Sequence, residues 1–140
     1  MSYALYVDLD EILFAVLTAD NDVVTHLGDE PARLYLSAVP VGLAILPYAV
    51  FNTIKTREIY RTPTAELEAV YRVTIYADNR VQAHAIQGAI HEAIMTSSFP
   101  ITDYGCYAVN WLGASVATSE EAGRIVWSVT GEYRVAWAKT

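Results

Sequence analysis

The chain has 140 residues, of which 54% are hydrophobic and 18% charged, with a net charge of −7 at pH 7. That length suits one domain over residues 1–140, because domains commonly contain about 100–150 residues. The acidic balance argues against a surface that grips nucleic acid, which needs clustered lysine and arginine. Cys106 is the only cysteine, which excludes an internal disulfide and a cysteine-based metal site.

The hydrophobic residues are interrupted too often to form a membrane span of about 20 apolar positions. The N-terminus also lacks the basic region of a signal peptide, so we expect a soluble, intracellular protein with no membrane partner. Ten tyrosines and three tryptophans fit either a well-packed domain or a subunit that buries aromatic surface against its neighbours.

One helix, followed by a short further helical turn, is predicted in the first third of the chain. Asp8 can cap a helix over residues 9–17, and Glu11 stands at the capping-box position. Asp20 can then cap a short further turn, which Gly28 ends.

An extended piece at Arg33–Ala38 leads into a proline-bounded apolar loop at Pro40–Pro47. Such a loop should be covered, either by the domain's own core or by a neighbouring subunit. Tyr48–Tyr60 and Glu66–Tyr76 are strand candidates around the turn signal Thr62-Pro63-Thr64. They predict an antiparallel hairpin whose polar part, KTREIYR, projects beyond the core.

The hydrophobic period changes sharply in the middle of the chain. Between Leu67 and Ile75 apolar residues recur at every second position, which is typical of a half-buried strand. After Asn79, a predicted N-cap with Gln82 three residues later, the period becomes helical up to Ile94. The predicted apolar stripe consists of Val81, Ala85, Ile86, Ala89, Ile90, Ala93 and Ile94.

The last third predicts strands at Tyr107–Val116 and Arg124–Ala138, joined by a polar connection at Ala117–Arg124. Together the elements predict a single α+β domain: an antiparallel or mixed sheet of about four to five strands packed against two helices.

No catalytic motif is apparent. The seven glycines form neither a phosphate-binding loop nor a nucleophile elbow. His84 and His91 would lie ~10.5 Å apart along a helix, too far to share one metal ion. We therefore expect no catalytic residue, cofactor or metal, and a function in binding or assembly.

The order of motifs resembles a known family. A capped N-terminal helix, the segment LPYAVFNTI, a polar hairpin, the segment VYRVTIYADNRVQAHAIQGAIHEAI and the terminal strand GEYRVAW follow one another. This order resembles the tail terminator, or tail-completion (tail-to-head joining), proteins of long-tailed bacteriophages. The resemblance covers nearly the whole chain from residue 8, and the apolar Pro40–Pro47 loop departs from it.

The resemblance implies a structural virion protein and not an enzyme. Such proteins usually form a homohexameric ring that caps the head-proximal end of the tail tube, ends its polymerisation and joins the tail to the head. The implied partners are other copies of the chain, the tail tube protein and the head-tail connector or stopper. DNA would pass through the lumen without specific binding. The implied location is the virion tail, after assembly in the host cytoplasm.

Assembly contacts are hypothesised at the hairpin tip, in the segments Phe99–Tyr104 and Ala117–Arg124, and on the back of the central helix. The candidate residues are Lys55, Arg57, Glu58, Arg61, His84, Gln87, His91, Glu92, Phe99, Tyr104, Glu120, Glu121 and Arg124.

Two alternatives stay open. One is a different neck subunit, such as an adaptor or stopper. The other is a small dimeric ligand-binding or enzymatic domain with a pocket lined by Tyr71, Tyr107, Trp111 and Trp127. Such a pocket needs a few convergent polar groups, and the sequence indicates none.

Overall fold

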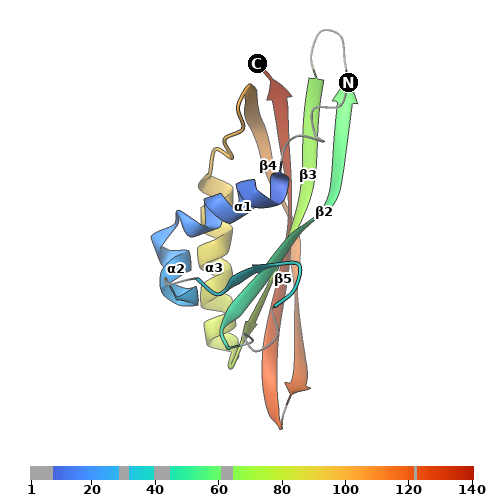
Figure 1. The fold of residues 1–140 in the computed structure, drawn as a ribbon. Helices are drawn as coiled ribbons and strands as arrows, with labels where there is room; N and C mark the ends of the chain where they lie inside the picture. The colour runs from blue at the N-terminus through green and yellow to red at the C-terminus, as the bar shows by residue number, and fades with distance from the viewer. Residues whose placement is uncertain (1–7, 29–31, 40–44, 61–64, 122) are drawn as a thin grey trace.

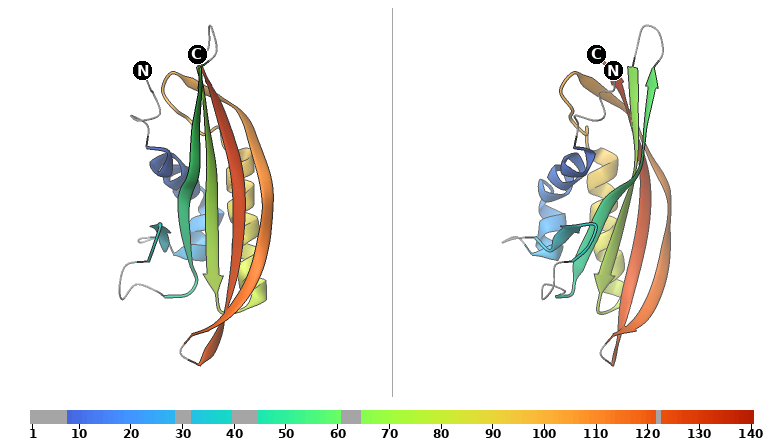
Figure 2. Two further views of the ribbon diagram at one scale, coloured as in Figure 1. Left: turned by 90° about the vertical axis from the view of Figure 1, so that its right-hand side faces the viewer. Right: turned by 45° about the vertical axis from the view of Figure 1, so that its right-hand side comes forward.

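The structure is a computed structural model that describes residues 8–28, 32–39, 45–60, 65–121 and 123–140. Three helices lie on one face of a five-stranded mixed sheet, and no described helix or strand covers the other, open face (Figures 1 and 2). In chain order the elements are α1 (Leu9–Thr18), α2 (Asn21–Leu27), β1 (Leu34–Leu36), β2 (Tyr48–Tyr60), β3 (Ala65–Ala77), α3 (Arg80–Thr96), β4 (Tyr104–Glu121) and β5 (Arg124–Lys139).

The strand order in the sheet is β1-β2-β3-β5-β4. β1 is parallel to β2, whereas the other neighbouring strands are antiparallel. β5 therefore lies between β3 and β4, although it follows β4 in the chain. No helix in the described ranges is long and apolar enough to cross a membrane.

The predicted helix starts are confirmed by their capping hydrogen bonds. The Asp8 carboxylate accepts from the Glu11 amide at 3.1 Å, and the Asn79 side chain accepts from the Gln82 amide at 2.8 Å. Asp20 likewise accepts from two amides of the turn that follows it. Because Asp20 caps a complete helix, α2 is separate from α1, and the predicted number of two helices is corrected to three.

The core lies between the helices and the covered face of the sheet. Every second residue of β3 from Leu67 to Ala77 is buried, as its alternating pattern predicted. The predicted helical stripe is partly wrong: Ile86 and Ile90 are buried, but Val81 is 76% exposed and Ala83 is buried. Residues i and i+2 of an α-helix point in directions about 200° apart around its axis. Val81 and Ala83 therefore cannot both face the sheet. Ala85 is also exposed.

Phe99 was expected on an exposed segment, and this expectation is wrong. Its side chain is completely buried, with its ring centroid 6.1 Å from that of Tyr71 and 6.3 Å from that of Trp137. The Trp137 indole also donates to the Phe99 carbonyl at 2.8 Å. Phe99 is therefore part of the main core.

The polar segment after Val116 forms strand and not a long loop. β4 continues to Glu121, which is opposite Arg124, the first residue of β5. The resulting hairpin extends past the helical layer (Figure 1). Strand beyond a core needs no apolar face, which is why the hydrophobic pattern did not reveal it.

Asp10 fastens α1 to the sheet. One oxygen of its carboxylate accepts from the Thr53 amide at 2.8 Å and from the Thr53 hydroxyl at 2.7 Å. Hydrogen bonds to a charged group contribute about 1.5–3 kcal/mol. We therefore expect Asp10→Ala to lower the free energy of unfolding by roughly this amount, measured by urea denaturation. Asp10→Asn keeps an acceptor and should lose less; equal losses in the two variants would contradict this role.

Candidate assembly surface

β4 forms a long open edge of the sheet. It pairs with β5 on one side, and no described strand lies on its other side. Its 18 residues include no lysine, arginine or proline, the residues that commonly protect an edge from pairing. Two irregularities in the pairing, at Cys106/Ala108 and Trp111/Gly113, are its only bulges in the described chain. β4 therefore presents backbone hydrogen-bonding groups along most of its length.

Large apolar side chains are exposed along this edge. Trp111 is 52% exposed and Val116 is 50% exposed, and both are opposite buried residues of the covered face, Tyr133 and Val129. Leu112, also half exposed, lines the open face. Large apolar side chains exposed on both faces of one edge strand favour an interaction with another protein surface.

Trp111 is supported from behind by α3. Its ring contacts His91 edge-on, with the centroids 5.3 Å apart, and His91 Nδ1 lies 2.9 Å from the Tyr133 hydroxyl. Burial raises the pKa of Tyr133 to about 12, against the opposing effect of a Gln87 hydrogen bond. The Tyr133 hydroxyl, which is protonated at neutral pH, lies within hydrogen-bonding distance of His91. The predicted assembly residues Gln87 and His91 therefore stand behind an exposed tryptophan that the assembly hypothesis did not include.

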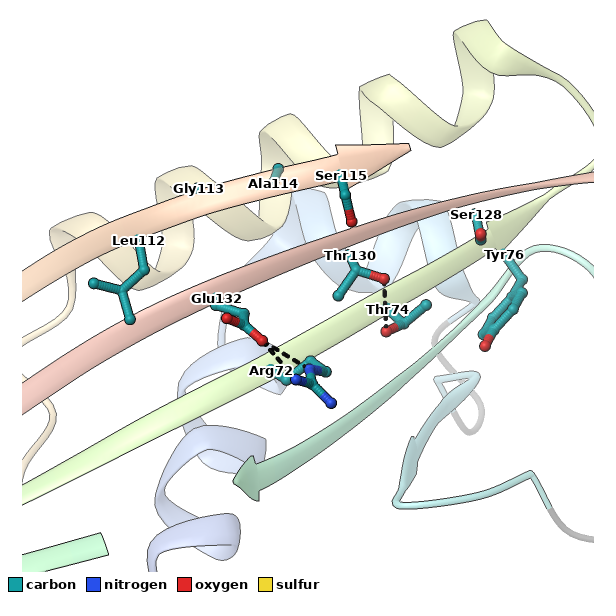
Figure 3. A pocket seen from close by; sticks show the side chains of 10 residues that line it. All are labelled: Arg72, Thr74, Tyr76, Leu112, Gly113, Ala114, Ser115, Ser128, Thr130 and Glu132. Carbon is teal, nitrogen blue, oxygen red and sulfur yellow. Dashed lines mark hydrogen bonds and ion pairs between the residues drawn. The ribbon is translucent and has the colours of Figure 1, made fainter. Parts of the chain in front are cut away.

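The open face of the sheet is polar. Arg72 forms an ion pair with Glu132 at 2.8 Å, and the hydroxyls of Thr74 and Thr130 are 3.1 Å apart (Figure 3). These residues line a shallow groove of about 630 Å³, which Leu112 borders. Arg72 and Glu132 are thus paired at the groove, whereas the exposed Lys55 and Arg57 lie farther along the same face.

The remaining candidate residues are spread over the molecule. In the distal half of β2, Lys55 and Arg57 are exposed and Glu58 is half-buried, while Arg61 lies outside the described residues. The β2–β3 and β4–β5 hairpins point to opposite ends of the sheet (Figure 1). His84 and Glu92 are exposed on α3, and Tyr104 is half-buried at the start of β4. Glu120 is exposed, Glu121 ends β4, and Arg124 forms a 3.6 Å ion pair with Asp78.

The four aromatic residues of the ligand-pocket alternative do not line one cavity. The hydroxyl of the buried Tyr71 donates to the Leu9 carbonyl at 2.8 Å, whereas the Tyr107 hydroxyl donates to Glu66. Trp111 contacts α3 through His91, and Trp127 packs on a separate small cluster. Nor does any group of acidic, histidine or cysteine side chains in the described chain have the geometry of a metal site.

Comparisons with known proteins agree with an assembly role. The model of the family "Tail completion protein gp17" matches residues 11–136. A chain of the solved structure "Virion of native gene transfer agent (GTA) particle" has the same fold, with a TM-score of 0.78 and 17% sequence identity. The likeness covers 98% of this chain and 99% of that one. A comparison with curated proteins returned no match. Since the family match spans most of its length, the chain belongs to the tail completion protein gp17 family, a family of structural proteins and not of enzymes.

Proposed function

We propose that this chain forms a ring, of six subunits, that caps the head-proximal end of a tail tube. The ring ends polymerisation of the tube and joins the tail to the head. Family membership supports the general role, and the open β4 edge with its exposed apolar residues supports the ring. In a ring each subunit uses one face to meet a different face of the next. Once the ring is closed, the exposed edge of every subunit is covered by a neighbour.

The open face of the sheet is suited to line the lumen. Arg72 pairs with Glu132, and Arg134 lies 4.0 Å from Glu68. Cations neutralised in this way cannot collect along the phosphate backbone, which non-specific DNA binding requires. DNA would therefore pass without being held. The helices, which add a second layer, would lie on the outside, where the circumference is larger.

The two hairpins support contacts at opposite ends of the ring. One carries Lys55 and Arg57, and the other carries Glu120 (Figure 1). We propose that one hairpin contacts the tail tube protein and the other the head-tail connector or stopper. The completed ring would then be part of the virion tail, after assembly in the host cytoplasm.

Tail completion with purified components tests this function. The wild-type chain, added to tubes assembled without it, should cap them at uniform length and make them competent to join heads, as scored by negative-stain microscopy. Reversing charge on one hairpin, with Lys55→Glu and Arg57→Glu, should weaken one of these activities about tenfold in those particles that microscopy shows as closed rings, which corresponds to ~1.4 kcal/mol. Glu120→Lys on the other hairpin should weaken the other activity. A compact dimer that neither forms rings nor caps tubes would contradict the proposal.

A further inference from the structure

The sheet has a second open edge besides β4, on the distal half of β2. β1 pairs with β2 only at Ala49–Phe51, and the amide of Thr53 is taken by Asp10. Among the described strands β2 pairs with β1 and β3 alone, and β1 ends opposite Phe51. One subunit therefore has two different strand edges, on opposite sides of the same sheet, that no described strand covers.

We infer that the ring closes by antiparallel pairing of β4 of one subunit with the distal half of β2 of the next copy. This inference rests on the proposed ring. The strands β2, β3, β5 and β4 each run antiparallel to the preceding one, so β2 and β4 of one chain run in opposite directions. Rotation about a ring axis preserves direction along that axis. The next subunit's β2 therefore lies antiparallel to β4. The alternation of strand directions within one subunit then continues into the next subunit.

The pairings across the sheet show which residues could meet. Lys55 is opposite Val70, Val70 is opposite Arg134, and Arg134 is opposite Asn110. Lys55 and Asn110 thus stand at one level, on the same face, at the two edges. Closing a sheet tilts its strands and staggers the pairing by several residues. β4 is long enough to accommodate this stagger, because Ser115 and Ala117 lie on the same face farther along the edge.

Charge favours the pairing of β4 with β2 over the pairing of identical edges. The only charged residues of β4 are Glu120 and Glu121, whereas the open part of β2 carries the exposed Lys55 and Arg57 beside the half-buried Glu58. Two β2 edges would bring these cations together, which is unfavourable. Two β4 edges would contribute acidic residues and no cation. A β4–β2 joint avoids this repulsion, because β4 carries no charge at the levels of Lys55 and Arg57: its two glutamates lie at the opposite end of the sheet.

Disulfide mapping in the assembled ring tests this joint. In a Cys106→Ser background, Lys55→Cys is combined in turn with Asn110→Cys, Ser115→Cys or Ala117→Cys. Neighbouring strands bring Cα atoms within the ~4.4–6.8 Å that a disulfide needs. Oxidation should therefore convert at least one pair into a covalent ladder reaching the full ring, while each single-cysteine variant stays monomeric on a denaturing gel.

Two results would overturn the inference and leave the proposed function standing. One is intact rings with no ladder from any of the three pairs. The other is covalent dimers from Asn110→Cys, Ser115→Cys or Ala117→Cys alone, which would indicate β4–β4 pairing. If the unmodified chain forms no ring and caps no tube, the proposed function fails as well, and microscopy of the wild type shows this independently of the cysteines.

A matched pair of substitutions measures the contribution of the edge. Val116→Lys places a charge on the β4 edge, whereas Val81→Lys makes the same change on α3 at an exposed site. The first should reduce the fraction of assembled rings at least about tenfold, because edge lysines block strand pairing. The second should stay within about twofold of wild type. Both variants should melt near the wild-type temperature as monomers. Equal assembly of the two folded variants would overturn the inference.

Discussion

Replacing Trp137 by alanine should lower the free energy of unfolding by about 3–5 kcal/mol, the usual range for removing a large buried aromatic side chain. Trp137 is completely buried and packs against Phe99, whose carbonyl accepts its indole N–H at 2.8 Å. The substitution therefore removes apolar contacts and leaves a buried carbonyl without its donor. Urea denaturation of the purified protein, followed by circular dichroism, measures the loss.

Two variants separate these contributions. Trp137→Phe keeps one aromatic ring but removes the N–H donor and part of the buried volume, so its loss should exceed the roughly 1–3 kcal/mol of an unpaired carbonyl and stay below that of Trp137→Ala. Trp111→Ala makes the same substitution as Trp137→Ala at a half-exposed edge position, and in the isolated subunit it should cost clearly less. A loss in Trp137→Ala no larger than that in Trp111→Ala would show that the core does not depend on Trp137.

Between pH 10 and pH 12 the protein should lose about 1.4 kcal/mol of stability per pH unit for each of two buried tyrosines. Burial raises the pKa of Tyr133 to about 12. Burial, reinforced by the carboxylates of Asp10 and Asp8, raises the pKa of Tyr71 further above its ordinary value. Unfolded tyrosines lose their proton near pH 10. The stabilisation is therefore fully present below pH 10, and it is lost as the pH rises towards the folded-state values.

Removing the hydroxyls tests this alkaline loss. Between pH 10 and pH 12, Tyr133→Phe should reduce the loss of unfolding free energy by about 1.4 kcal/mol per pH unit. The Tyr71→Phe, Tyr133→Phe double variant should reduce it further. Stability at pH 7 provides the baseline, because Tyr71→Phe also loses the hydrogen bond to the Leu9 carbonyl. An unchanged slope in the double variant would assign the alkaline loss to other groups.

Local patterns predicted much of the fold. The strand and helix around Asn79 follow from a change of period and a capping side chain, both of which are properties of neighbouring residues. Phe99 was misplaced because a single aromatic between Ser98 and Pro100 gives no periodic signal. It adopts a positive φ of 45° and reaches the core through contacts with Tyr71 and Trp137, which are distant in the chain.

The candidate surface was less predictable, because it depends on the order of strands. Nothing local indicates that β5 is inserted between β3 and β4, and this insertion is what makes β4 an edge. The exposure of Trp111 follows from that placement. The helical period alone predicted that Gln87 and His91 lie on the back of the central helix. That Trp111 of β4 lies beside His91 follows only from the strand order of the sheet.

The central position of β5 also governs how the protein must be made. Contacts between β3 and β5 join residues far apart in the chain, such as Thr74 and Thr130, which are separated by 56 positions. Such non-local pairing forms late, after the closure of a long loop. While a ribosome is still synthesising β5, β3 and β4 have no strand between them. A prematurely released chain therefore lacks the strand that joins the two halves of the sheet, and only a fully translated chain can hold β4 in place for assembly.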